Sequence, residues 1–142
     1  MIRKENKFSE HRVKIYAAEL IEALAYLHKN GIIYRDLKPE NVLLDPQGHL
    51  RLIDFGLSKM NLDRFELTKS FCGTPDYLSP EVIIGKGYTF DSDWWTLGVV
   101  IYEMLHSRPP HFQKDKDHIM SDIVSKPIPI NSSLSKPCKS FL

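Results

Sequence analysis

The sequence lacks the features that mark a secreted, membrane-spanning or nucleic-acid-binding protein. It has only two cysteines, Cys72 and Cys138, which follow neither a metal-ligand spacing nor the pattern of a disulfide framework. Its longest apolar run, residues 97–101, is far too short to cross a bilayer, and residues 1–8 are charged without the apolar core of a signal peptide. The formal net charge of +1 offers no electrostatic basis for binding nucleic acid. We therefore expect an intracellular, cytoplasmic protein with no transmembrane segment and no nucleic-acid partner.

Two stretches have the apolar spacing of helices that pack against a core. Residues 9–30 repeat apolar side chains at three- and four-residue steps, from a possible Ser9 cap to Gly31, where a left-handed residue costs little. Residues 91–105 are apolar on almost every side, which predicts a buried central helix. A shorter helix should begin at residues 79–81, Ser-Pro-Glu, and another should span about 117–125.

A short β-hairpin is expected between these helices. Residues 42–44 and 50–53 are apolar runs of strand length, and residues 45–48, Asp-Pro-Gln-Gly, form a turn between them. Pairing of the two runs would place Asn41 and Asp54 side by side at the open end of the hairpin. The predicted fold class is mainly α, with this hairpin as its β component (α+β).

The 142 residues are enough for one domain with a core of its own. We expect that domain to occupy residues 1–125. Residues 57–78 show no steady period, and a loop of that length in a compact domain is usually functional. Residues 126–142 are rich in proline and serine, which predicts a poorly ordered tail.

Residues 34–41, Tyr-Arg-Asp-Leu-Lys-Pro-Glu-Asn, and residues 54–56, Asp-Phe-Gly, have the chemistry that phosphoryl transfer requires. That reaction needs an acceptor for the proton of the attacking hydroxyl, a cation near the phosphate and oxygen ligands for magnesium. Asp36 can be the acceptor and Lys38 the cation. Asn41 and Asp54 can supply the oxygen ligands.

Each short motif has an ordinary explanation when taken alone, because Asp-Phe-Gly is a common turn and Arg-Asp is often a surface ion pair. Their order is more specific, since residues 73–75, Gly-Thr-Pro, and 79–81, Ser-Pro-Glu, follow them as in the kinase signature set. Over about residues 8–125 the chain resembles the C-terminal lobe of eukaryotic Ser/Thr protein kinases. Tyr34, residues 71–78 and the paired tryptophans after Asp93 make it most similar to the AGC group, the relatives of cyclic-AMP-dependent kinase and protein kinase B.

The resemblance implies a role for each matching residue in a reaction with ATP and Mg²⁺. Asp36 would be the catalytic base and Lys38 the contact to the γ-phosphate, and Thr74 would bond to both. Asn41 and Asp54 would hold the metal. The residues implied in nucleotide binding are Lys38, Glu40, Asn41, Leu43 and Asp54, with Leu43 as the floor under the adenine ring.

Other carboxylates match positions that bind substrate or support the site. Glu40 and Glu103 correspond to residues that bind an arginine of a basic protein substrate, which two carboxylates can do. Asp93 would anchor the backbone of residues 34–41 from the central helix. Glu81 would be a second anchor, which in the family pairs with an arginine from later helices.

The resemblance also implies regulation by an upstream activating kinase. Ser70 matches the activation-loop phosphosite, and Arg35 and Lys59 match the cations that receive its phosphate. Such a phosphate would gain charge-assisted hydrogen bonds and order the loop. Thr68 is the neighbouring alternative.

The chain contains no Gly-x-Gly-x-x-Gly and no Val-Ala-Ile-Lys strand, so we expect the N-terminal lobe to be absent. On that basis the isolated chain should not bind magnesium-ATP measurably. Two functions remain open. The chain is part of an ATP-dependent Ser/Thr protein kinase that transfers the γ-phosphate to protein Ser or Thr, or it is a truncated, inactive kinase lobe that acts as a protein-binding module.

Overall fold

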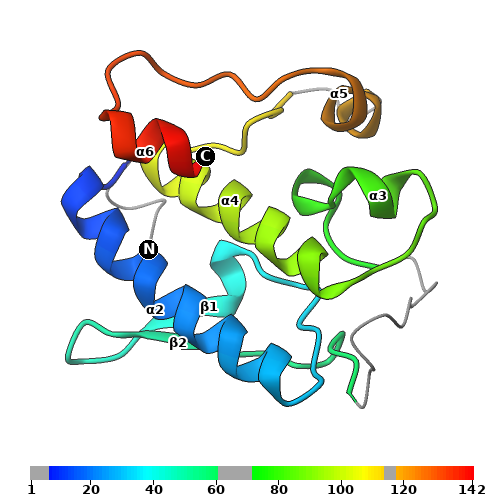
Figure 1. Ribbon diagram of the computed structural model, residues 1–142. Coiled ribbons are helices and arrows are strands. Elements are labelled where there is room, and N and C mark those ends of the chain that lie inside the picture. The colour runs from blue at the N-terminus through cyan, green and yellow to red at the C-terminus, as the bar shows by residue number, and fades with distance from the viewer. Residues whose placement is uncertain (1–6, 61–71, 114–117) are drawn as a thin grey trace.

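The computed structural model describes residues 7–60, 72–113 and 118–142 and consists of helices with one small antiparallel sheet (Figure 1). Its helices are α2 (Glu10–Lys29), α3 (Pro80–Ile83), α4 (Phe90–His106), α5 (Ile119–Ser125) and α6 (Lys136–Phe141). Strands β1 (Val42–Leu44) and β2 (Leu50–Leu52) form the sheet, and the 3-10 turns are η1 (Pro39–Asn41) and η2 (Pro75–Tyr77). Within the described residues, no helix has the length and apolarity needed to cross a membrane.

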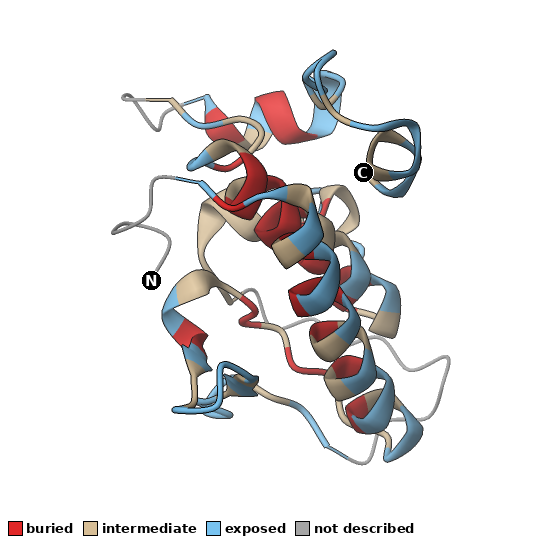
Figure 2. Ribbon diagram, turned by 90° about the vertical axis from the view of Figure 1, so that its left-hand side faces the viewer, coloured by how far each residue is buried: buried red, intermediate tan, exposed pale blue. Residues whose placement is uncertain are grey.

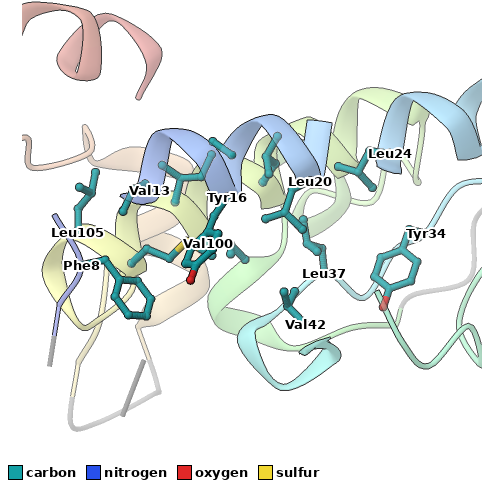
Figure 3. Packing of buried hydrophobic residues seen from close by; sticks show 14 of the residues in the cluster. Phe8, Val13, Tyr16, Leu20, Leu24, Tyr34, Leu37, Val42, Val100 and Leu105 are labelled. Carbon is teal, nitrogen blue, oxygen red and sulfur yellow. The ribbon is translucent and has the colours of Figure 1, made fainter. Parts of the chain in front are cut away.

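The two long helices, α2 and α4, pack against each other and supply most of the core. The apolar stripe predicted on α2 is buried, as are the inward positions of α4; the cluster includes Val13, Tyr16, Leu20, Leu24, Leu97, Val100, Ile101 and Met104. Figure 3 shows Val13, Tyr16 and Leu20 of α2 near Val100 of α4, with Leu37 and Val42 of the same cluster below Leu20. In Figure 2 the buried residues run along both helices, whereas most of the hairpin is only partly covered.

Both long helices begin at the caps that their sequences favour. Ser9 Oγ accepts a hydrogen bond from the backbone N–H of Arg12 at 3.4 Å, which confirms the predicted start of α2. Thr89 and Ser92 form a reciprocal capping box at the start of α4. Helix α4 ends at His106 and is capped by Ser107, which has a left-handed φ of 67°. The predicted 91–105 helix is therefore confirmed, with one more residue at each end.

The predicted hairpin is present, with Asn41 opposite Ile53 rather than Asp54, and it is tied to α2. Val42 pairs with Leu52 and Leu44 with Leu50. Glu19 on α2 joins the start of β2, because one carboxylate oxygen lies 2.6 Å from His49 Nδ1 and the other accepts from the backbone N–H of Leu50 at 2.7 Å. This contact raises the pKa of His49 and lowers the pKa of Glu19.

The second half of the chain places shorter elements around α4. Helix α5 packs on both α3 and η2, with Leu78, Val82 and Tyr88 in a second small core. Helix α5 covers residues 119–125 of the helix predicted over 117–125; His118 stands at its cap position, and residue 117 lies outside the described residues. Ser79 stands at the cap position of α3, but its Oγ is buried and makes no hydrogen bond within the described part of the chain.

The structure differs from the sequence-based expectation at residues 126–142. The sequence predicted a poorly ordered tail, but residues 136–141 form α6, whose Ser135 cap accepts from the backbone N–H of Cys138 at 3.3 Å. Leu134, Cys138 and Leu142 pack against the main core. A helix of six residues shows almost no periodicity in sequence, and its stability comes from this packing.

Candidate active site

Two predicted site residues, Lys38 and Asn41, donate to the carboxylate of Asp36, which is only 7% exposed. Lys38 Nζ donates to both carboxylate oxygens, at 2.9 and 2.8 Å. Asn41 Nδ2 donates to the backbone oxygen of Asp36 at 2.9 Å and to its Oδ2 at 2.8 Å. Thr74 Oγ1 accepts from Lys38 Nζ at 3.4 Å, which brings the segment after residue 71 to the same point. An acid, a cation, a carboxamide and a hydroxyl therefore share one hydrogen-bonded cluster.

A second cluster holds the backbone just before Asp36. Asp93, on the first turn of α4, is 1% exposed and accepts from the backbone N–H groups of Tyr34 and Arg35 at 2.9 Å each. His28 Nε2 lies 2.8 Å from the same carboxylate. Arg35 has a left-handed φ of 66°, a conformation that costs a non-glycine residue about 1–3 kcal/mol. The hydrogen bonds to Asp93 hold the backbone in that conformation.

The open end of the hairpin lies beside the Asp36 cluster. The backbone N–H of Ile53 donates to the oxygen of Asn41 at 3.0 Å, and the hydroxyl of Tyr34 donates to the oxygen of Ile53. Asp54, the next residue, is exposed, with a left-handed φ of 61° and its Oδ1 accepting from the backbone N–H of Gly56. The Phe55 ring meets the Tyr34 ring edge-on at 5.3 Å. Burial raises the pKa of Tyr34, so its hydroxyl stays protonated as a donor.

Glu103, one of the two glutamates predicted to bind a substrate arginine, contacts Tyr77. Tyr77 donates its hydroxyl hydrogen to Glu103 Oε2 at 2.5 Å, and the charge of Glu40 also acts on that hydroxyl. Burial and these carboxylates raise the pKa of Tyr77, which keeps the phenol neutral. The structure therefore brings Glu40 and Glu103 to the same neighbourhood.

The predicted regulatory residues are only partly within the described residues, because Ser70 and Thr68 lie outside them. Arg35 donates through Nε to the oxygen of Leu57 at 2.6 Å, and its guanidinium lies 5.6 Å from the centre of the Tyr88 ring. Lys59 pairs through its backbone with Ile33, and its side chain is exposed.

Two other predicted positions have clear surroundings. Glu81 accepts from Ser92 Oγ at 2.8 Å, so a serine of α4 contacts the carboxylate for which the sequence suggested an arginine. Leu43, the predicted floor under adenine, is 51% exposed on β1.

Sequence reasoning did not single out His28 and Tyr77. His28 occupies the last turn of α2, and nothing in its spacing connects it to Asp93, which lies 65 residues further along the chain. Tyr77 is part of the 71–78 motif, but its bond to Glu103 depends on how η2 packs on α4.

Comparison with known proteins agrees with the chemistry of these clusters. A family model described as the protein kinase domain matches residues 1–142. The chain is 47% identical over 141 residues to the serine/threonine-protein kinase sgk-1 of Caenorhabditis elegans, which covers 99% of this chain and 30% of that protein. It is 47% identical to YPK1 of Saccharomyces cerevisiae and 45% identical to human Sgk1, of which it covers 21% and 33%.

The chain belongs to the protein kinase domain family. These relatives are Ser/Thr kinases of the AGC group, which confirms the resemblance drawn from the motifs. The chain spans a third or less of the length of each of these three relatives.

Proposed function

We propose that this chain provides the catalytic loop, the metal ligands and the activation segment of an ATP-dependent Ser/Thr protein kinase. The observation that carries the proposal is the cluster in which Lys38 and Asn41 donate to Asp36 and Thr74 accepts from Lys38. A structural ion pair would need only the lysine. The added carboxamide and hydroxyl suit a site that holds a nucleotide phosphate and a substrate hydroxyl together.

In this reaction Asp36 accepts the proton of the attacking Ser or Thr hydroxyl. Its carboxylate is oriented by Asn41 and by Lys38, and a substrate hydroxyl would bind by taking the place of one of these donors. Lys38 would then neutralise charge on the transferring phosphate. Thr74 supports the lysine from the activation segment.

The residues present fit Mg²⁺ bound to ATP. Asp54 offers an exposed carboxylate, and Asn41 offers the oxygen of a carboxamide whose nitrogen is already directed to Asp36. Magnesium on nucleotide phosphates takes one or two such hard oxygen ligands and keeps several waters. The bound metal would neutralise the phosphates, while the protein positions Asp36 and the substrate hydroxyl.

We infer that the chain is the C-terminal lobe of the kinase domain and that a second lobe covers the hairpin. Leu43, Ile53 and Phe55 are 51%, 37% and 48% exposed around the open end of the hairpin. Apolar side chains gathered beside polar catalytic groups are typical of one wall of a ligand cleft. Leu43 would form the floor of the adenine site.

The substrate and its regulation follow from the remaining charges. Glu40 and Glu103 favour a protein substrate with arginine near the target Ser or Thr, because carboxylates bind guanidinium with paired hydrogen bonds. Phosphorylation of Ser70 by an upstream kinase would add a phosphate dianion that Arg35 and Lys59 could bind. That step would order the activation segment next to Thr74.

The proposal is tested by joining this chain to a segment that can form the other wall of the cleft. The segment of C. elegans sgk-1 that precedes its matched region is fused ahead of this chain. Transfer of labelled phosphate from ATP to an arginine-containing serine peptide is then measured. We expect transfer with magnesium, and a loss of about 10²–10⁴-fold in Asp36→Asn with ATP binding retained. Asp91→Asn, an exposed carboxylate on α4, is the matched control and should keep full activity.

Two results would contradict the proposal. One is an Asp36→Asn chimera that turns over like the parent. The other is a parent chimera that folds and binds magnesium-ATP but transfers no phosphate, which would favour the alternative of a docking module.

A further inference from the structure

The turn that ends α2 contains the one Asn-Gly pair of the sequence, Asn30–Gly31. The other four asparagines are followed by lysine, valine, leucine or serine. Asn30 is exposed at the C-cap of α2, and Gly31 has a left-handed φ of 70°. In Figure 1 the chain turns here and runs on toward β1. Neither residue belongs to the candidate active site.

This pair can undergo a covalent change that needs only water. The backbone nitrogen of Gly31 attacks Cγ of Asn30, the new N–Cγ bond forms as the Cγ–Nδ2 bond breaks, and the backbone amide proton leaves with Nδ2 as ammonia. Water then opens the succinimide ring at either carbonyl, which gives aspartate or isoaspartate. Glycine favours ring closure because it has no Cβ to crowd the nitrogen and its backbone is the least restricted.

Two hydrogen bonds hold the groups that would react. The backbone N–H of Gly31 donates to the oxygen of His28 at 3.0 Å, and Asn30 Nδ2 donates to the oxygen of Tyr26 at 2.7 Å. Both bonds belong to the last turn of an exposed helix end, and helix ends fray at a small cost in free energy. The ring therefore closes from the frayed turn, and its rate depends on how often that turn opens.

The residues after the turn lead to the candidate active site. Ile33 exchanges two backbone hydrogen bonds with Lys59, at 3.0 Å each, and the backbone N–H of Tyr34 donates to Asp93. Isoaspartate carries the main chain through its side-chain carbon, so it adds one backbone atom just before these bonds. It also places a carboxylate at the C-terminus of a helix, where negative charge is unfavourable.

We propose that Asn30–Gly31 is a modification site, at which Asn30 converts to isoaspartate and loosens the backbone that leads to Asp36. The exposed asparagine, the following glycine and the turn held by two hydrogen bonds supply the substrate of the reaction and the control of its rate. The proposal is independent of the proposed kinase function, because it concerns only the backbone between α2 and residue 36.

The first test incubates the 142-residue chain at mildly alkaline pH and follows each asparagine by peptide mass mapping. The peptide with Asn30 should gain the mass difference between NH₂ and OH, and a methyltransferase specific for isoaspartate should label it. Asn131 is the internal control, because it is also exposed but precedes serine, and it should react several-fold more slowly. Urea should raise the rate at Asn30 several-fold, because unfolding removes the two hydrogen bonds.

Two variants separate ring closure from the fold. Gly31→Asn keeps a residue that tolerates the left-handed conformation but adds a side chain beside the attacking nitrogen, so Asn30 should react several-fold more slowly. Asn30→Gln would need a larger ring and should give no isoaspartate at this position. Both variants should keep the far-ultraviolet circular dichroism of the parent.

The effect on the backbone is measured by amide hydrogen exchange, after the modified chain has been separated by ion exchange. Residues 32–35 should exchange several-fold faster than in the parent, whereas residues 99–104 in the buried part of α4 should exchange alike. Asn30→Asp adds the carboxylate without the extra backbone atom, so it should speed the exchange of residues 32–35 less than isoaspartate does.

Three outcomes would overturn the proposal. One is an Asn30 that stays intact while Asn131 reacts. Another is an equal rate at Asn30 in the parent and in Gly31→Asn, or in the folded and the urea-unfolded chain, which would remove the role of the glycine or of the hydrogen-bonded turn. The third is isoaspartate at position 30 that leaves the hydrogen exchange of residues 32–35 unchanged.

Discussion

Replacing Asp93 by alanine should destabilise the protein far more than any exposed carboxylate of the same helix. Asp93 is 1% exposed and accepts from two backbone N–H groups, those of Tyr34 and Arg35. Alanine would leave both donors buried without a partner. Since each unpaired buried donor costs about 1–3 kcal/mol, the free energy of unfolding should fall by about 2–6 kcal/mol. His28 would also lose its contact with the carboxylate.

Asparagine at the same position keeps nearly the same side-chain volume and changes only the hydrogen-bonding groups. Its amide oxygen can accept from one backbone donor, but its NH₂ group would face the other. Asp93→Asn should therefore cost about 1–3 kcal/mol, less than Asp93→Ala. The released backbone of Arg35, which has a φ of 66°, should relax toward an ordinary conformation.

The measurement is urea unfolding of the 142-residue chain, monitored by far-ultraviolet circular dichroism. Tryptophan fluorescence is not used, because Trp94 and Trp95 lie directly after Asp93. Asp91→Ala is the matched control, because Asp91 lies in the same first turn of α4 but is exposed. Asp91→Ala should lower the free energy of unfolding only by the lost interaction with the helix dipole, about 0.3–1 kcal/mol. If Asp93→Ala costs no more than Asp91→Ala, Asp93 does not support residues 34–36 as described.

Two further perturbations test contacts outside this cluster. His49→Gln removes the contact that raises the pKa of His49 and lowers the pKa of Glu19. The contribution of this contact to the free energy of unfolding is complete between pH 4.5 and 6.5, the unfolded pKa values of the two groups. It is lost as the pH rises through the folded pKa of His49. The difference in urea midpoint between parent and variant should therefore be larger at about pH 5.5 than at about pH 9. Equal differences at the two pH values would contradict a stabilising contact between His49 and Glu19. Tyr77→Phe removes the bond to Glu103 and should lower the free energy of unfolding by about 1.5–3 kcal/mol. Tyr26→Phe, on an exposed ring, should leave it unchanged in the same denaturation assay.

The elements that the sequence predicted best are those whose signals are local. The stripe on α2, the cap at Ser9 and the turn at residues 45–48 are each read within a few residues, and the structure has them where the sequence indicated. Helix α6 was missed for the opposite reason. It is too short to show a period, and its stability depends on Glu10 and on the core far away in the sequence.

The candidate site divides in the same way. The residue types of 34–41 and 54–56 suggested phosphoryl transfer, because acid, cation and oxygen ligands are recognisable by type. The partners that hold them were not recognisable. The contacts of Asp93 with His28 and Tyr34 join residues 65 and 59 positions apart, and those of Tyr77 and Ser92 depend on the packing of α3 and η2 on α4.

Helix α4 supports both halves of the candidate site, which explains why so much of it is buried. Asp93 on its first turn holds the backbone before Asp36. One turn later, Thr96 donates to the oxygen of Tyr77, and about two turns beyond Thr96, Glu103 accepts from the hydroxyl of the same tyrosine. The two halves then meet where Lys38 donates to Thr74. The distance between residues 34–41 and residues 72–78 is thus set by the spacing of Asp93, Thr96 and Glu103 along one helix.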